Sequence, residues 1–209
     1  MANLPRTKIK LTQSELKRQR DALRQYERYL PTLQLKKQQL QLEILHQQGV
    51  LLGKKNSLSE MKKSTETWSG LLVEAPEIRQ WIIRRKIITS KKNIAGVDVL
   101  VFEKADFEPI EYDLFLTPLW VDTGLETLRD MVSVREEIRV IEKGISVLQH
   151  ELRISTQRVN LFEKIKIPEA KEAIRVIKIH IGDQMTNAVG RSKIVKNKIE
   201  EATYEEVAI

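Results

Sequence analysis

The first third of the chain carries apolar residues at the alternating three- and four-residue spacing of a coiled coil. Between about residues 14 and 68, one series repeats every seven residues with one position skipped, and its members are Leu16, Leu23, Leu30, Ile44, Leu51 and Leu58. A second series follows three residues later, as Tyr26, Leu33, Leu40, Met61 and Trp68. These a and d positions predict one long helix with a narrow apolar seam for a partner helix. The polar residues that interrupt this seam are Gln19, Lys37, Gln47 and Lys54.

A second segment with the same spacing begins near Gly124. Its seam consists of Met131, Val134, Ile138, Ile141, Ile145, Leu148, Leu152, Val159 and Phe162, and Ser155 is its one polar break. Beyond Pro168 the spacing continues through Ile174, Ile177, Ile181, Met185 and Ala188, but its phase has slipped by about one residue. A proline removes one backbone hydrogen bond, so we expect a kink at Pro168 and we expect Pro31 to act similarly in the first helix.

The residues between the two helical segments differ in composition. This part of the chain, residues 69–123, holds two of the three Trp and three of the six Pro residues. Residues on both sides of the SKKN sequence at 90–93 are β-branched, and Val97, Val99 and Val101 alternate. This pattern predicts a β-hairpin or small sheet packed with short helices around Trp81 and Trp120.

The predicted fold is therefore mainly α: a long antiparallel two-helix coiled coil with a small α+β head inserted between the helices. The expected divisions are an N-terminal coiled-coil helix (1–68), a globular head with the hairpin (69–123) and a C-terminal coiled-coil helix (124–209). The N-terminal seam is expected to use Leu16, Leu23, Leu30, Leu33 and Leu40, and the C-terminal seam Ile138, Ile141, Ile145, Leu148 and Leu152.

Charge narrows the class of partner only slightly. Lys and Arg number 36 against 29 Asp and Glu, a net charge of +7, and the excess lies in the first third of the chain. Such an excess of positive charge favours binding to nucleic acid, anionic lipid or an acidic protein, but it is equally typical of a solvated helix face. The chain has no Cys, no segment long and apolar enough to span a bilayer and no signal-peptide pattern at its start, so we expect a cytoplasmic protein.

Candidate chemistry is sparse. His46, His150 and His180 have no second metal ligand at helical spacing, and the sequence GVLLGKKNS at 49–57 departs from a phosphate-binding loop in its glycine spacing and in having Lys55 where Ser or Thr would hold magnesium. Adjacent acids such as Glu136 and Glu137 point about 100° apart on a helix. We therefore expect no catalytic residue, no metal site and no cofactor.

The sequence RVNLFEKIKIP at 158–168 resembles the late signature of the D subunit of the rotary V-type and A-type ATPases. The residues that match the signature are Arg158, Val159, Asn160, Phe162, Glu163, Ile167 and Pro168. The early residues from PRTKIKLTQ onward and NIAGVDV at 93–99 are similar to the family's first helix and middle region, so the resemblance covers the whole chain.

The resemblance implies a central rotor shaft that couples ATP hydrolysis or synthesis to ion transport without being catalytic itself. The implied partners are the catalytic and non-catalytic nucleotide-binding subunits of the ATPase ring, the small F subunit of the central stalk and a funnel-shaped stalk subunit on the membrane side. Nucleic acid is not among them, and the protein would be peripheral on the membrane. Two alternatives stay open: a coiled-coil structural adaptor, and a basic coiled coil that binds nucleic acid.

Overall fold

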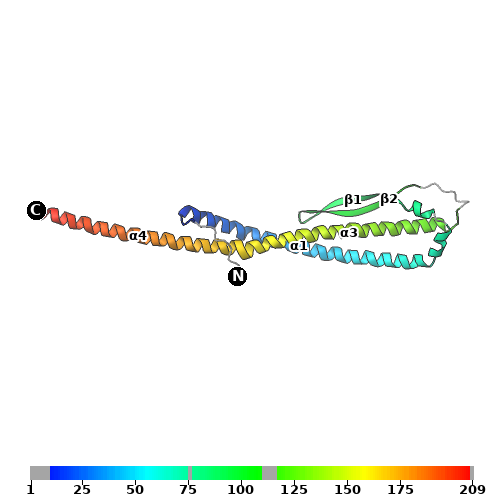
Figure 1. The fold of residues 1–209 in the computed structure, drawn as a ribbon, viewed down its shortest axis with the longest axis horizontal. Coiled ribbons are helices and arrows are strands. Elements are labelled where there is room, and N and C mark those ends of the chain that lie inside the picture. Colours follow the sequence, from blue (N-terminus) through cyan, green and yellow to red (C-terminus); the bar gives the residue numbers. More distant parts are fainter. Residues whose placement is uncertain (1–9, 75–76, 110–116, 208–209) are drawn as a thin grey trace. The chain divides into compact units, whose positions relative to one another are not determined.

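A computed structural model describes residues 10–74, 77–109 and 117–207, and these residues form long helices and one small sheet (Figure 1). The elements in chain order are α1 (Gln13–Glu66), the 3₁₀ turn η1 (Ser69–Val73), α2 (Ile78–Trp81), β1 (Arg84–Ile94), β2 (Val97–Phe107), α3 (Val121–Leu161), the π turn η2 (Phe162–Lys166) and α4 (Ile167–Val207). The predicted fold class is confirmed. Among the described residues, no helix is long and apolar enough to cross a membrane.

The chain divides into two compact units. The central unit is Leu35–Thr156, and the terminal unit combines Met1–Gln34 with Gln157–Ile209. In the central unit α1 and α3 lie side by side and run antiparallel (Figure 1). Ion pairs join Lys54 Nζ to Glu137 Oε2 at 2.8 Å and Lys55 Nζ to Glu142 Oε1 at 2.7 Å. Both pairs are partly exposed, so each stabilises by at most about 1 kcal/mol and mainly marks the direction of the pairing.

The sheet is a two-stranded antiparallel hairpin, as predicted. The SKKN residues belong to β1, and the chain reverses at Ala95 and Gly96, whose φ angles of 51° and 77° are both positive. The side chain of Asn93 donates to Asp98 Oδ1 at 2.6 Å and accepts from the Gly96 N–H at 3.1 Å. These two bonds hold the strand ends together and allow Ala95 its unfavourable conformation.

The hairpin completes the core of the central unit. Val97 and Val99 are buried, whereas Val101, the third residue of the predicted alternation, is exposed. The buried cluster consists of Leu40, Ile44, Val97, Val99 and Leu148. Three elements therefore close one apolar core, because neither the seam nor the hairpin buries its apolar face alone.

A second cluster lies where α2 and the start of α3 meet. Its buried members are Ile78, Val121 and Leu125, and Trp81 and Trp120, the residues around which the sequence predicts a packed head, lie half-buried against it. The Trp120 ring lies 6.1 Å from that of Trp68, which links the residues just after α1 to the start of α3.

The terminal unit pairs the start of α1 with the residues around η2 and the start of α4. The rings of Tyr26 and Phe162 are 5.3 Å apart, and Lys171 Nζ lies 3.5 Å from Glu27 Oε1. The buried apolar residues on the C-terminal side of this pair are Val159, Ala170, Ala173 and Ile177. The small alanines allow the two helices to approach closely.

The predicted change of phase near Pro168 is produced by η2. The Ile167 N–H donates to the Phe162 carbonyl, five residues back instead of the four of an α-helix. One extra residue is thereby inserted, and the seam steps eight residues from Val159 to Ile167 instead of seven. Pro168 is the second residue of α4, and α1 continues unbroken through Pro31.

We predict opposite effects for alanine at two helical glycines. A Cβ atom at Gly144 would lie 2.8 Å from Val99 Cγ1, whereas one at Gly182 would meet nothing within 4 Å. Gly182→Ala should raise the free energy of unfolding by about 0.5–1 kcal/mol through helix propensity. Gly144→Ala should lower it by about 1–2 kcal/mol, because overpacking against the hairpin exceeds that gain. Denaturant unfolding measures both, and a stabilising Gly144→Ala would contradict the packing.

Candidate functional site

The surface of α1 in the central unit carries a second apolar series besides the seam. It has the three-four spacing of a coiled coil, and its members are Leu35, Gln38, Leu42, Leu45, Gly49 and Leu52. We call these six residues the outer leucine face. Its leucines are between 54% and 68% exposed. Single exposed leucines are ordinary, but four at heptad spacing on one helix face are typical of a surface that receives another helix.

Charge is depleted around the outer leucine face. Residues 38–53 contain one charged residue, Glu43, whereas 31% of the whole chain is charged and about five would be expected in sixteen positions. Even Glu43 is engaged, because its Oε1 accepts a hydrogen bond from Gln47 Nε2 at 2.8 Å. Depletion of charge distinguishes the buried centre of a protein interface from ordinary surface.

Two glycines stand in the same exposed part of α1. A Cβ atom at Gly49 or at Gly53 would meet nothing within 4 Å, so packing within the described residues does not require either glycine. Each glycine costs the helix about 0.5–1 kcal/mol relative to alanine. A groove of about 590 Å³ lies beside the outer leucine face, lined by Gln38, Gln41, Leu42, Ile44, Leu45 and Leu152. The helix thus keeps open space beside its exposed leucines.

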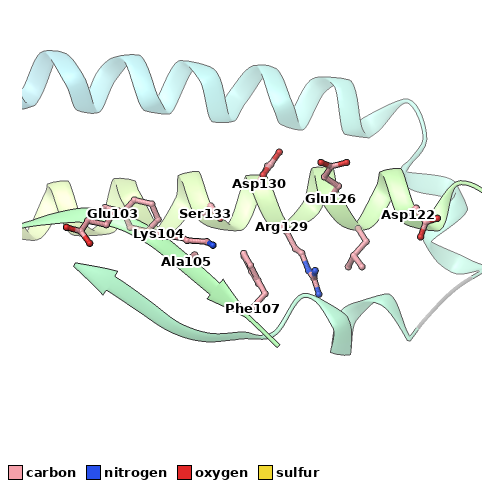
Figure 2. A pocket seen from close by; sticks show the side chains of 11 residues that line it. Glu103, Lys104, Ala105, Phe107, Asp122, Glu126, Arg129, Asp130 and Ser133 are labelled. Carbon is pink, nitrogen blue, oxygen red and sulfur yellow. The ribbon is translucent and has the colours of Figure 1, made fainter. Parts of the chain in front are cut away.

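A pocket between β2 and α3 is a weaker candidate. Figure 2 shows Arg129 extending from α3 toward Phe107, while Glu126 and Asp130 point away from it. The guanidinium carbon of Arg129 lies 5.4 Å from the centre of the Phe107 ring, and one of its nitrogens donates at 3.2 Å to each of the carbonyls of Trp81 and Glu108. This arginine ties the ends of α2 and β2 to α3, which is a structural role rather than a site for an anionic ligand.

The terminal unit carries the other exposed apolar series. All residues from 182 to 200 are exposed, and the large apolar ones among them include Met185, Val189, Ile194 and Val195. Near the start of α1, Leu11–Gln13 line a groove with Ile181, Met185 and Ala188. Beyond that level α4 continues to Val207, with no described residue of α1 beside it (Figure 1).

The predicted seam residues differ in how deeply they are buried. Leu40, Ile138, Ile145 and Leu148 are buried, and the half-buried ones are Leu16, Leu23, Leu30, Leu33, Ile141 and Leu152. Of the signature residues, Val159 is buried, Phe162 and Ile167 are half-buried, and the exposed ones are Arg158, Asn160, Glu163 and Pro168. The signature residues thus spread around the helix on either side of η2 and do not converge on one site.

The three histidines considered as metal ligands in the sequence do not form a site. His46 and His150 are exposed, and His180 lies 3.0 Å from the side-chain nitrogen of Gln184. No three potential metal ligands come together within the part of the chain that the structure describes. The outer leucine face was not predicted from the sequence, although its spacing is visible there, because the neighbouring seam with the same period already accounts for the helix.

The chain is similar to known proteins over nearly its whole length. A family model described as the D subunit of ATP synthase matches residues 15–197. The chain is 42% identical to the V-type ATP synthase D subunit of Borreliella burgdorferi, over 92% of this chain and 96% of that one. It is 31% identical to the protein of the same description from Chlamydia pneumoniae, over 92% and 93% of the two chains, and 32% identical to that of Chlamydia abortus, over 95% and 97%.

Proposed function

Because this chain belongs to the family of the ATP synthase D subunit, we propose that it is the central rotor shaft of a V-type rotary ATPase. The observation that carries the proposal is a family match that extends from residue 15 to residue 197, through both helical segments and the hairpin. The shaft itself performs no chemistry. It couples ATP hydrolysis or synthesis in the surrounding ring to ion transport in the membrane, and it is a cytoplasmic protein held peripherally at the membrane by the complex.

The shaft acts by favouring different conformations in the subunits around it. A helical pair is not symmetric about its axis, so each ring subunit meets a different face, and the angle of the shaft is thermodynamically linked to nucleotide affinity in each subunit. By the same linkage, hydrolysis in one ring subunit favours rotation of the shaft. The exposed segment 182–200 of α4, which carries four basic residues from Arg191 onward, is the part proposed to enter the ring.

We assign the outer leucine face to the small F subunit of the central stalk, called the small stalk subunit below. An uncharged face with four exposed leucines suits a partner that stays bound, because dissociation would leave that apolar area unfavourably hydrated. The end of the central unit that carries α2 is assigned to the funnel-shaped subunit on the membrane side. The alternative of a free-standing coiled-coil adaptor would instead use the outer leucine face to form homodimers.

The double variant Leu42→Gln, Leu45→Gln tests the assignment to the small stalk subunit. Both side chains are more than 60% exposed, so the free energy of unfolding should change by less than about 0.5 kcal/mol. The dissociation constant for the purified small stalk subunit should rise at least about tenfold, the effect of removing central apolar anchors. The matched control is Ile194→Gln, Val195→Gln, which should leave binding unchanged. Titration calorimetry gives both constants, and equal affinity for both variants would place the small stalk subunit elsewhere.

Removal of residues 189–209 tests the assignment to the ring. Residues 182–200 are exposed, so the shortened chain should fold and bind the small stalk subunit normally. Reconstituted complexes should assemble poorly with the ring or hydrolyse ATP with less ion transport per ATP. A shortened chain that pumps normally but no longer binds the membrane-side funnel would show that the shaft has the opposite orientation.

The isolated chain should neither bind nor hydrolyse ATP. The GVLLGKKNS segment lies within the α-helix α1, where backbone N–H groups bond along the helix and do not form a phosphate cradle. Calorimetry with Mg-ATP should therefore give no heat of binding. Stoichiometric ATP binding would contradict a purely mechanical role, and a homodimer in sedimentation would favour the adaptor.

A further inference from the structure

Gly49 and Gly53 lie inside α1, four residues apart, and nothing within the described residues requires a glycine at either position. A glycine is needed where φ is positive or where another part of the chain approaches too closely for a Cβ atom. Neither condition holds here. The described glycine with a positive φ is Gly96, and a Cβ atom at Gly49 or Gly53 would meet nothing within 4 Å. Each of the two glycines nevertheless weakens the helix relative to alanine.

A break in the helix does not explain the two glycines either. Lys54 and Lys55, directly after Gly53, form ion pairs of 2.8 and 2.7 Å with Glu137 and Glu142 of α3. The α-helix α1 continues without interruption on both sides of these residues. Because α1 is continuous here and paired with α3, the glycines do not mark a junction between two helical segments.

Gly49 lies at the centre of the face that α1 turns away from the core. At about 100° per residue, it is about 180° around the helix from Leu40, which is fully buried. Gly53 lies about 40° farther around the helix, and Leu42 and Leu45 lie within about 40° of Gly49. Both leucines are more than 60% exposed. The glycines therefore leave a depression on the side of α1 that carries the outer leucine face.

A depression of this kind suits a second helix. Leucines at three-four spacing fit between the ridges of a facing helix, and such pairs normally keep their axes about 8–10 Å apart. Without a Cβ atom, Gly49 and Gly53 allow the backbone of the facing helix to come closer, with glycine Cα hydrogens against its carbonyl oxygens. Contacts made at such a close approach would offset the loss of helix propensity. A partner that only covered the leucines would gain nothing from the glycines.

We propose that a helix of the small stalk subunit packs along the outer leucine face and comes closest to α1 at Gly49 and Gly53. The identity of the partner rests on the proposed function, whereas the close approach rests on the two glycines. Residues 38–53 contain one charged residue, so the facing helix meets an uncharged surface up to the second glycine. Uncharged surface is what a helix that stays bound needs at the centre of its interface.

The variants Gly49→Ala and Gly53→Ala, made singly and together, separate close approach from simple apolar docking. Alanine has the higher helix propensity, so the denaturant midpoint of the isolated chain should rise. The dissociation constant for the purified small stalk subunit should nevertheless rise at least about tenfold in the double variant, because the added methyl groups would overlap the partner's backbone. Without close approach, the added apolar area should leave the affinity unchanged or increase it. Titration calorimetry gives the constants.

The double variant Gly182→Ala, Gly190→Ala is the matched control. A Cβ atom at either of these positions in α4 also meets nothing within 4 Å, so the unfolding midpoint should again rise. Binding of the small stalk subunit should not change. Unchanged or tighter binding of the Gly49→Ala, Gly53→Ala variant would refute the close approach, and a lower unfolding midpoint would show that these glycines serve the fold instead.

The Leu42→Gln, Leu45→Gln variant distinguishes failure of the close approach from failure of the proposed partner. If it loses binding while alanine at positions 49 and 53 does not, the close approach is wrong and the assignment of the outer leucine face stands. If neither variant loses binding, both are wrong. If the chain alone forms dimers in sedimentation that alanine at positions 49 and 53 disrupts, the facing helix belongs to a second copy and the proposal fails.

Discussion

Burial of a narrow apolar seam is the constraint on which every other feature of this protein depends. With 41% apolar and 5% aromatic residues, the chain has too little apolar area for a thick core, and each long helix can bury only one stripe. The stripe of α1 meets α3 in the central unit, and in the terminal unit it meets the residues around η2 and the start of α4. Because the stripe is narrow, the rest of each helix surface stays available for other subunits.

The long helices could be predicted from sequence because the period of the apolar residues is long and regular, but local conformation could not. At the hairpin, the polar SKKN residues resemble a turn, whereas the chain turns at Ala95–Gly96. The deciding factor is tertiary: Val97 and Val99 must reach the cluster around Leu40, which fixes the register of β2 and with it the position of the turn. A single sequence does not reveal such a requirement before the packing is known.

The outer leucine face shows that even a regular sequence pattern is not always sufficient for prediction. Its spacing is as regular as that of the seam, and a heptad count cannot tell which of two neighbouring stripes is buried within the chain. The distinction comes from position: Leu40 and Ile44 lie under the hairpin, whereas Leu42 and Leu45 lie on the exposed side of the same helix turn. The low content of charged residues over 38–53 is an independent sequence signal of a partner surface. A helix face that contacts only water does not need to exclude charged residues.

The signature at 158–168 is best understood through the backbone it encodes. Its exposed polar members, Arg158, Asn160 and Glu163, point to no common ligand, whereas Phe162 and Pro168 bracket η2. Phe162 packs on Tyr26 at the start of the turn, and Pro168 penalises a regular α-helix at its end. A heptad seam drifts around a straight helix, and one inserted residue restores the contact with α1 for the residues that follow. The segment 158–168 therefore sets the rotational phase of α4, which decides which of its faces remains exposed to a partner.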